Sequence, residues 1–189
     1  MKVIVEVSAR HCHLSGKHLE KLFGRGYQLE PVKNLSQKKQ YSSNSTVTII
    51  GPKNEITDVR ILGPIRDVSQ VEISFTDSYY LGIKAPLKIS GDLSDAAPVI
   101  LSGPKGKVKL FHGLIIARRH FHCDLATAKK LKLRDGQKIK VKITGPRSLI
   151  FNEVVTRIRK DFRPRIQLDT DEGNAAFVHG QTKGEIIIN

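Results

Sequence analysis

A His-x-His pair that occurs twice is the feature that most constrains what this chain can fold into. His11 and His13 recur as His120 and His122, and the matching histidines are separated by the same 109 residues. Each pair is followed, two residues later, by a side chain suited to cap a helix and then by a short helical run. Two copies of one unit predict two similar lobes, with both histidine pairs facing one shared cleft. The capping residues are Ser15 and Asp124.

The rest of the sequence predicts a mainly β fold. Short apolar runs recur along the chain, and residues 137–143 alternate at period two, as a half-buried strand does. Gly-Pro dipeptides stand after or between such runs, where they end strand pairing. A turn is expected at Phe111-His112-Gly113, between two of the runs. Many short strands with regular turn signals are typical of a barrel or a sandwich.

The composition indicates an anionic partner. The 189 residues carry a net charge of +14, with a sequence pI near 9.9. The basic residues are dispersed, aromatic residues make up 6% of the chain and Trp is absent, so binding of nucleic acid through a stacking platform is disfavoured. A positive field for a small anionic substrate and a merely solvated basic surface both fit the charge.

No sequence signal points to a membrane or to an oxidising compartment. No apolar run approaches the ~20 residues needed to span a bilayer, and no signal-peptide pattern precedes the first expected strand. The two cysteines, Cys12 and Cys123, are too few for a disulfide framework, so a reducing compartment is expected.

The histidine pairs are candidate metal ligands. On an extended segment, His11 and His13 lie on the same face because strand side chains alternate with period two. A catalytic zinc commonly takes three protein ligands, so a third must come from another segment. By the same alternation Cys12 points to the opposite face and is expected to be a small buried hydrophobe. The direction of Cys123 stays open.

Longer motifs surround these histidines. They are Arg10-His11-Cys12-His13-Leu14-Ser15, Gly63-Pro64-Ile65-Arg66, Gln70-Val71-Glu72-Ile73-Ser74, Ala117-Arg118-Arg119-His120-Phe121-His122 and Leu168-Asp169-Thr170-Asp171-Glu172. Through these motifs and their spacing, the chain from about Val3 to Ala176 resembles the PduL-type phosphate propanoyltransferases, the phosphotransacylases of bacterial propanediol-degrading and related microcompartments. The resemblance implies an enzyme that interconverts acyl-CoA plus phosphate with acyl phosphate plus CoA.

The resemblance also implies a fold and a domain division. The implied fold is two small β-barrel lobes capped by short α-helices, with the active site between them, which agrees with the duplication. The first strand is exchanged in the family, so one lobe would be residues 10–117 and the other 1–9 with 118–189.

Site residues follow from the resemblance position by position. His11, His13 and Glu72 correspond to the ligands of one zinc, and His120 and His122 to ligands of a second. Arg66 corresponds to the phosphate-binding arginine, whose bidentate fork suits a phosphate or an acyl phosphate. The positions that contact CoA are Ser8, Lys33, Arg60 and Asn174.

One departure from the family pattern concerns the second zinc. Gln167 stands where the family has a histidine as third ligand, and an uncharged amide oxygen is a poorer zinc ligand than imidazole. An inactive or repurposed CoA- and metal-binding relative is therefore the alternative to a working di-zinc enzyme. Two further departures are Lys38-Lys39 in place of a Pro-Gly-like turn and Ser45 in place of an acidic residue.

The sequence leaves the route of acyl transfer and the cellular context as hypotheses. Direct transfer between CoA and phosphate is favoured over an acyl-enzyme on Cys12, because that thiol is expected to face away from the metal ligands. The family's N-terminal encapsulation extension is not seen before the first strand, so the expected location is the bacterial cytoplasm, with a microcompartment as the further option. No residue decides between a monomer and a homo-oligomer.

Overall fold

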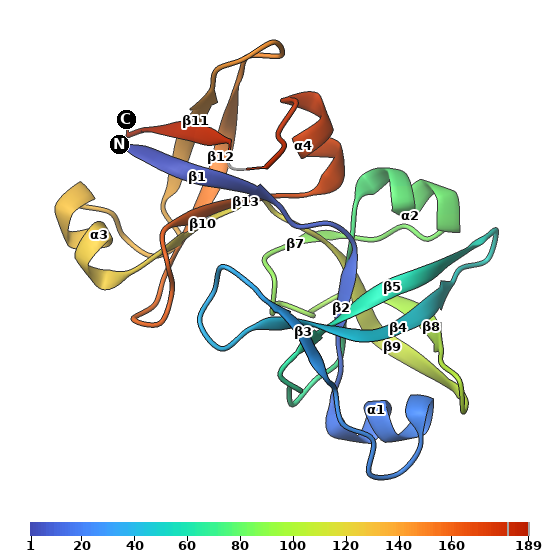
Figure 1. The fold of residues 1–189 in the computed structure, drawn as a ribbon. Coiled ribbons are helices and arrows are strands. Elements are labelled where there is room, and N and C mark those ends of the chain that lie inside the picture. Colours follow the sequence, from blue (N-terminus) through green and yellow to red (C-terminus); the bar gives the residue numbers. More distant parts are fainter. Residues whose placement is uncertain (181, 189) are drawn as a thin grey trace. The chain divides into compact units, whose positions relative to one another are not determined.

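The computed structural model describes residues 1–180 and 182–188, and its chain divides into two compact units (Figure 1). The first unit comprises Ala9–Leu35 and Lys39–Ala117. The second unit comprises Met1–Ser8, Ser36–Lys38 and Arg118–Asn189. Each unit has its own hydrophobic core, as an independently folding barrel requires.

The first unit is a closed ring of β-strands. The ring runs β4–β5–β2–β6–β9–β8 and returns to β4. β3 extends the sheet beside β4, and β7 pairs with β9. The strands are β2 (His11–His13), β3 (Pro31–Asn34), β4 (Tyr41–Ile50), β5 (Glu55–Gly63), β6 (Gln70–Ile73), β7 (Leu87–Lys88), β8 (Ala97–Ser102) and β9 (Lys107–Ala117), and the helices are α1 (Gly16–Phe23) and α2 (Phe75–Leu81).

The second unit is also a closed barrel. Its order is β1–β13–β10–β12–β11–β14, and β14 pairs back onto β1. The strands are β1 (Lys2–Val7), β10 (His120–Cys123), β11 (Lys138–Ile143), β12 (Leu149–Ile158), β13 (Arg165–Leu168) and β14 (Lys183–Ile187), and the helices are α3 (Leu125–Leu131) and α4 (Thr170–Ala175). The prediction of a mainly β fold with two barrels and short helices is therefore confirmed.

The two barrels share one topology. Each histidine strand pairs in parallel with one neighbour and antiparallel with another: β2 with β5 and β6, and β10 with β12 and β13. β1 and β9 occupy matching places in the two barrels. β1 pairs in parallel with β13 and antiparallel with β14, and β9 pairs in parallel with β6 and antiparallel with β8. Because β1 directly precedes β2 and β9 directly precedes β10, each copy of the repeat contributes its first strand to the barrel of the other copy.

Side chains along β2 and β10 alternate between the barrel core and the face that carries the histidine pair. Cys12 and Phe121 are fully buried in the cores of their respective units, between histidines that point to the opposite face. Cys123 also lies in the core of the second unit, which answers the question that the sequence left open. The expected caps are present as well, since Ser15 accepts from the N–H of residue 18 and Asp124 from that of residue 127.

One local prediction was wrong. Phe111-His112-Gly113 is not a turn, because β9 extends from Lys107 to Ala117, and these residues lie where its pairing with β8 shifts register. Gly113 is instead required by packing, since a Cβ at that position would lie 2.7 Å from the Leu110 side chain. None of the helices in the described part of the chain is long and apolar enough to cross a membrane.

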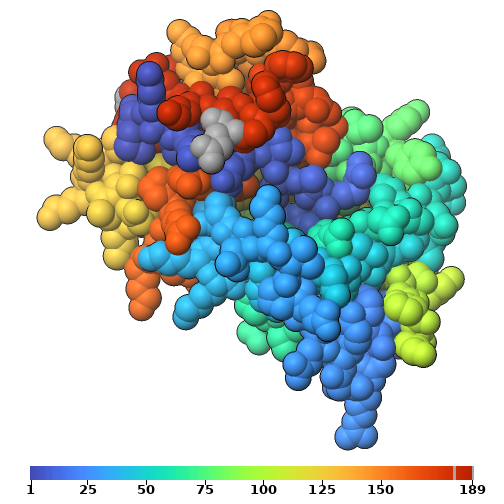
Figure 2. Space-filling model, viewed as in Figure 1, coloured from blue at the N-terminus to red at the C-terminus, as the bar shows by residue number. Residues whose placement is uncertain are grey.

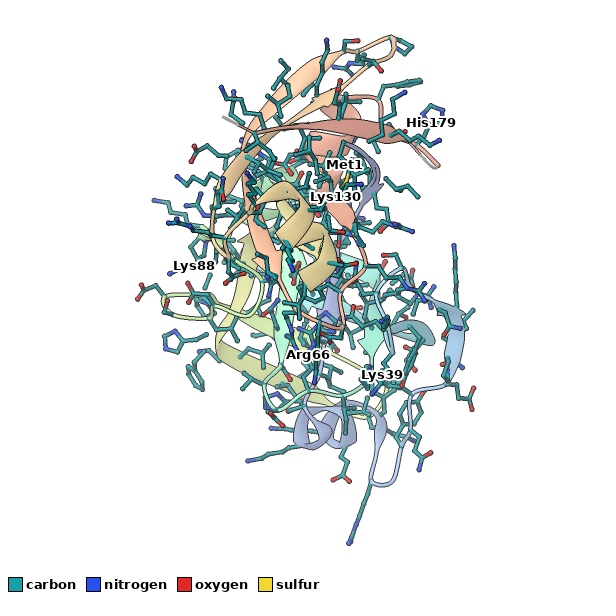
Figure 3. The ribbon with its side chains drawn as sticks, turned by 90° about the vertical axis from the view of Figure 1, so that its left-hand side faces the viewer. Met1, Lys39, Arg66, Lys88, Lys130 and His179 are labelled. Atoms are coloured by element: carbon teal, nitrogen blue, oxygen red, sulfur yellow. The ribbon has the colours of Figure 1, made fainter. Side chains whose placement is uncertain are left out.

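The surface of the first unit includes all of β3. Its four residues are exposed, and the light-blue segment around them lies on the face turned to the viewer in Figure 2. Lys39 and Lys130, which are labelled in Figure 3, are exposed and come from separate segments, one in each unit. This agrees with the dispersed basic residues noted in the sequence.

The exchanged strand makes a testable prediction about stability. Val5 is fully buried in the core of the second unit, so Val5→Ala should lower the free energy of unfolding of that unit by about 2 kcal/mol. We expect faster hydrogen exchange in β10 to β14 and unchanged exchange in β4 to β8, because the cavity opens in only one core. Val47→Ala, in the core of the first unit, is the matched control and should give the reverse pattern. Faster exchange in β4 to β8 of the Val5 variant would contradict the strand exchange.

Candidate functional site

The first unit brings three potential metal ligands together. His11, His13 and Glu72 are all buried, and each offers a ligand atom within 4.8 Å of the others. The histidines come from β2, and the carboxylate comes from β6 through the direct pairing of His11 with Glu72. Two imidazoles and one carboxylate form a set that zinc commonly binds. Among the described residues this is the one group of three His, Cys, Asp or Glu side chains that could hold a metal ion.

Hydrogen bonds fix the orientation of both imidazoles. The His11 ring nitrogen Nδ1 lies 2.8 Å from the carbonyl oxygen of Ala9, and that of His13 lies 3.2 Å from the carbonyl oxygen of Leu62. A carbonyl only accepts, so each Nδ1 carries a proton, and in the neutral ring the lone pair is then on Nε2. The other nitrogen of a metal-binding histidine is usually held in this way. The Nε2 of His11 is 3.8 Å from Oε2 of Glu72, so the free ring nitrogen faces the carboxylate.

Two residues that the sequence analysis did not single out hold the carboxylate of Glu72. The amide of Gln70 donates to Oε1 of Glu72 at 2.5 Å, and the hydroxyl of Ser90 donates to the same oxygen at 2.6 Å. Oε2 remains directed toward His11. Period-two alternation could have found Gln70, which shares a strand face with Glu72. Nothing local in the sequence marks Ser90.

Burial keeps His13 in the form that can bind a metal. It lowers the pKa of His13 to about 3, and nearby His11 and Arg66 act in the same direction. His13 is therefore neutral throughout the physiological range, which is the form that binds metal.

Arg66 is built in beside this pair. Its backbone N–H donates to the carbonyl of Leu14 at 2.9 Å, and Arg66 forms an isolated parallel bridge with Ser15. Figure 3 shows the labelled Arg66 close to the ribbon of α1 in the same unit. Its charge is close enough to lower the pKa of His13, so the guanidinium and the histidine pair lie within electrostatic reach of each other.

The second unit repeats the arrangement with a different third residue. His120 is paired in register with Gln167, as His11 is with Glu72. The Nδ1 of His120 lies 2.9 Å from the carbonyl oxygen of Arg118, just as the Nδ1 of His11 lies against the carbonyl oxygen of Ala9. The rings of His120 and His122 are 4.5 Å apart between centroids, so both side chains share one site.

His122 is the least satisfied of the four paired histidines. Its Nδ1 is buried and has no hydrogen-bond partner among the described residues. Burial lowers the pKa of His122 to about 2, with His120, Arg157 and Arg159 acting in the same direction. A buried ring nitrogen without a partner is costly, and a bound cation would use the imidazole of this neutral side chain.

Gln167 is engaged in a hydrogen bond. Its amide nitrogen donates to the carboxylate of Glu6 at 2.8 Å. Glu6 lies on β1, directly opposite Gln167 in the parallel pairing of β1 with β13. Nothing in the neighbours of Glu6 along the chain distinguishes it from any other charged strand residue, so the sequence does not mark it as part of a site.

The expected CoA-contacting residues are divided between the units. In the first unit, Lys33 is exposed on β3, and Arg60 on β5 stands opposite His11. The guanidinium of Arg60 donates to the carbonyl oxygens of residues 43 and 44, at 3.1 and 3.0 Å. In the second unit, the backbone N–H of Ser8 donates to the carbonyl of residue 168 at 2.8 Å, and Asn174 is exposed on α4.

His18 is half-buried and bonded to a neighbouring segment. Its Nδ1 lies 2.8 Å from the hydroxyl of Ser69, which also accepts the backbone N–H of Ser15 at 2.9 Å. Burial lowers the pKa of His18, and Lys17 and Lys21 add to the effect. These bonds fasten the start of α1 to the segment that precedes β6.

Two closed barrels, built from one repeat and each bearing a buried histidine pair, define a duplicated double-barrel protein with at least one cluster fit for a metal. A family profile described as phosphate propanoyltransferase matches residues 4–179. Proteins named phosphate propanoyltransferase from Thermotoga maritima, Alkaliphilus metalliredigens and Listeria monocytogenes are 47%, 44% and 45% identical to this chain. These alignments cover 94%, 99% and 98% of this chain and 85%, 88% and 87% of the relatives. The chain belongs to the phosphate propanoyltransferase family, a family of phosphotransacylases, and the resemblance seen in its motifs is confirmed.

The buried thiols make a prediction about reactivity. Burial raises the pKa of Cys12 to about 12 and that of Cys123 to about 11, so neither forms much thiolate near neutral pH. We expect native protein at pH 8 to resist a disulfide reagent such as dithionitrobenzoate, and both thiols to react once the chain is unfolded in guanidinium. Mass spectrometry of the labelled protein assigns each site. Rapid native labelling of Cys12 would reopen the acyl-cysteine route.

Proposed function

We propose that this chain is a zinc-dependent phosphate acyltransferase that interconverts propanoyl-CoA, or a similar short acyl-CoA, and phosphate with acyl phosphate and CoA. The observation that carries the proposal is the buried cluster of His11, His13 and Glu72 beside Arg66, in a chain of the phosphate propanoyltransferase family. The relatives' name specifies both a phosphate acceptor and a propanoyl group.

Each histidine pair would hold one zinc ion. In the first unit the two free Nε2 atoms and Oε2 of Glu72 are the donors, and Gln70 and Ser90 keep the carboxylate in place. In the second unit the donors are His120 and His122, with Gln167 in the third position. A bound zinc ion supplies a Lewis acid that can polarise a thioester carbonyl or stabilise a thiolate.

Arg66 would bind and orient the phosphate. Its fork can donate two parallel hydrogen bonds to phosphate oxygens and keep a third oxygen directed at the thioester carbon. In the forward reaction that oxygen forms a bond to the acyl carbon, the carbon–sulfur bond breaks, and CoA leaves as its thiolate. No acyl-enzyme is needed, in agreement with the fully buried position of Cys12.

The remaining roles concern CoA and the setting of the enzyme. Lys33 and Arg60 would bind the anionic part of CoA, and Ser8 and Asn174 would contact the same cofactor by hydrogen bonding. The proposed setting is the bacterial cytoplasm, with residence in a propanediol-degrading microcompartment and self-association as further parts of the proposal.

The second candidate function is a CoA- and metal-binding relative without turnover. The observation that favours it concerns Gln167, which is the residue paired with His120. The amide nitrogen of Gln167 donates a hydrogen bond to Glu6. Metal content measured beside turnover separates the candidates. The relative without turnover predicts CoA binding, fewer than two zinc ions per chain and no release of CoA from acyl-CoA in the presence of phosphate.

Metal removal tests the main proposal. Dialysis against EDTA should abolish phosphate-dependent CoA release, and added Zn²⁺ should restore it. Glu72→Gln should weaken binding at the first site by about 10-fold or more, since an anionic ligand becomes neutral. Elemental analysis measures the metal, and thiol release measures the reaction. Full activity in EDTA-treated protein that contains no metal would contradict the proposal.

Substitution of Arg66 tests phosphate binding. Arg66→Ala should lower kcat/KM for phosphate by about 100-fold or more, and Arg66→Lys should recover only part of it, because a lysine lacks the bidentate fork. Arg25→Ala removes an exposed arginine of the same unit and should leave the rate unchanged. Equal losses in the Arg66 and Arg25 variants would mean that only the overall charge matters.

A further inference from the structure

We propose that Glu6 is a positioning residue of the second histidine site, where it fixes the amide of Gln167 so that the amide oxygen serves as the third metal ligand. This inference rests on the proposed function, since it concerns a metal bound by His120 and His122. It assigns a role to a carboxylate that no motif of the sequence includes. It also makes the glutamine a working ligand of a complete site.

The direction of the Gln167 amide follows from the chemistry of its partner. A carboxylate only accepts hydrogen bonds, so the group 2.8 Å from Oε2 of Glu6 must be the NH₂ of Gln167. The carbonyl oxygen of the amide is then turned away from Glu6. A glutamine without such a neighbour could present either end to a metal, and the NH₂ end cannot bind one.

The strand register puts the histidine on the other side of Gln167. Gln167 on β13 is paired with Glu6 on β1 and with His120 on β10, so the three residues form one row across three neighbouring strands. Their neighbours Val5, Ile166 and Phe121 are fully buried in the barrel core. The row therefore lies on the opposite, outer face of the sheet, with the amide between the carboxylate and the imidazole.

Glu6 is itself held in place. The hydroxyl of Ser36 donates to Oε2 at 2.7 Å, and the guanidinium Nε of Arg165 donates to Oε1 at 3.2 Å. Both partners belong to the same unit. A carboxylate with these contacts loses little further freedom when it binds the amide, which is what a group that orients a ligand requires.

The first site has the same kinds of side chain with two roles exchanged. There the carboxylate of Glu72 is the metal donor, and it is held by the amide of Gln70 and the hydroxyl of Ser90. In the second site the metal ligand is the amide oxygen of Gln167. The amide is held by the carboxylate of Glu6, which also accepts a hydrogen bond from the hydroxyl of Ser36. One carboxylate, one amide and one serine accompany each histidine pair, and in the second site the carboxylate is also paired with Arg165.

Zinc titration of the metal-free 189-residue chain tests the role of Glu6. Two classes of Zn²⁺ binding are expected in the unaltered protein, one lost in His13→Ala and the other in His122→Ala. Glu6→Gln should weaken the second class by about 10- to 100-fold and leave the first unchanged. Glu30→Gln is the matched control, because Glu30 accepts from the Asn44 amide at 2.8 Å on the exposed surface of the first unit.

An exchange of the two residues separates positioning from simple structural support. In Glu6→Gln with Gln167→Glu, the carboxylate becomes the donor and the amide its partner, as in the first site. The second class of Zn²⁺ binding should return to at least the original affinity. A merely structural pair would recover its melting temperature in the exchanged variant without this gain in affinity. Circular dichroism and retained first-class binding show that each variant is folded.

The outcomes distinguish the inference from the proposed function. Two equally tight classes in Glu6→Gln would overturn the role of Glu6 while leaving the di-zinc enzyme intact. The inference would also be overturned if the unaltered protein bound Zn²⁺ only at the first site, the class that is lost in His13→Ala. The second site would then bind no zinc even with Glu6 present. If His13→Ala and His122→Ala both bound Zn²⁺ like the unaltered chain, the proposed function itself would fail.

Discussion

Both histidine sites depend on one antiparallel strand pairing in each barrel. β2 with β6 sets Glu72 opposite His11, and β10 with β13 sets Gln167 opposite His120. Directly paired residues stand on the same face of a sheet with Cβ atoms about 4.5–5.5 Å apart, so the register alone brings the third side chain to the histidines. A shift by one residue would bring a core side chain such as Val71 to that face, and burial of the core prevents such a shift.

A second repeated contact joins each histidine strand to the helix that follows its antiparallel partner. Arg10 pairs with Asp77 at 2.8 Å, and Arg119 pairs with Glu172 at 2.6 Å. Both acids are the third residue of a helix and close a capping box there. The two units therefore share this ion pair at the start of the helix as well as the order of the strands. The repeat is one structural unit that occurs twice.

The sequence predicted the part of this repeat that keeps a constant spacing. The histidine pairs and the capped helices after them recur at 109 residues, and they were found from that spacing alone. The third residues, Glu72 and Gln167, are 95 residues apart, because residues 24–40 between α1 and β4, which include β3, form a longer connection than residues 132–137 between α3 and β11. No fixed offset relates them, so the repeat does not reveal them: the resemblance to the family supplied both positions, and strand pairing shows that they are equivalent in the fold. Ser90 and Ser36 lie in connections outside the repeated elements, where no periodicity could reveal them.

The exchanged strands explain why the carboxylate can change place between the sites. β9 sets Ile115 beside Glu72, and β1 sets Glu6 beside Gln167, so Ile115 and Glu6 occupy the same position in the two barrels. Where the third residue is itself a carboxylate, the neighbouring strand carries a fully buried apolar side chain. Where the third residue is neutral, the neighbouring strand carries the charge. If both positions carried a carboxylate, two like charges would lie close together in a partly buried site. If neither position carried one, the histidine pair would have no carboxylate beside it. Each barrel therefore carries one carboxylate in this pair of positions.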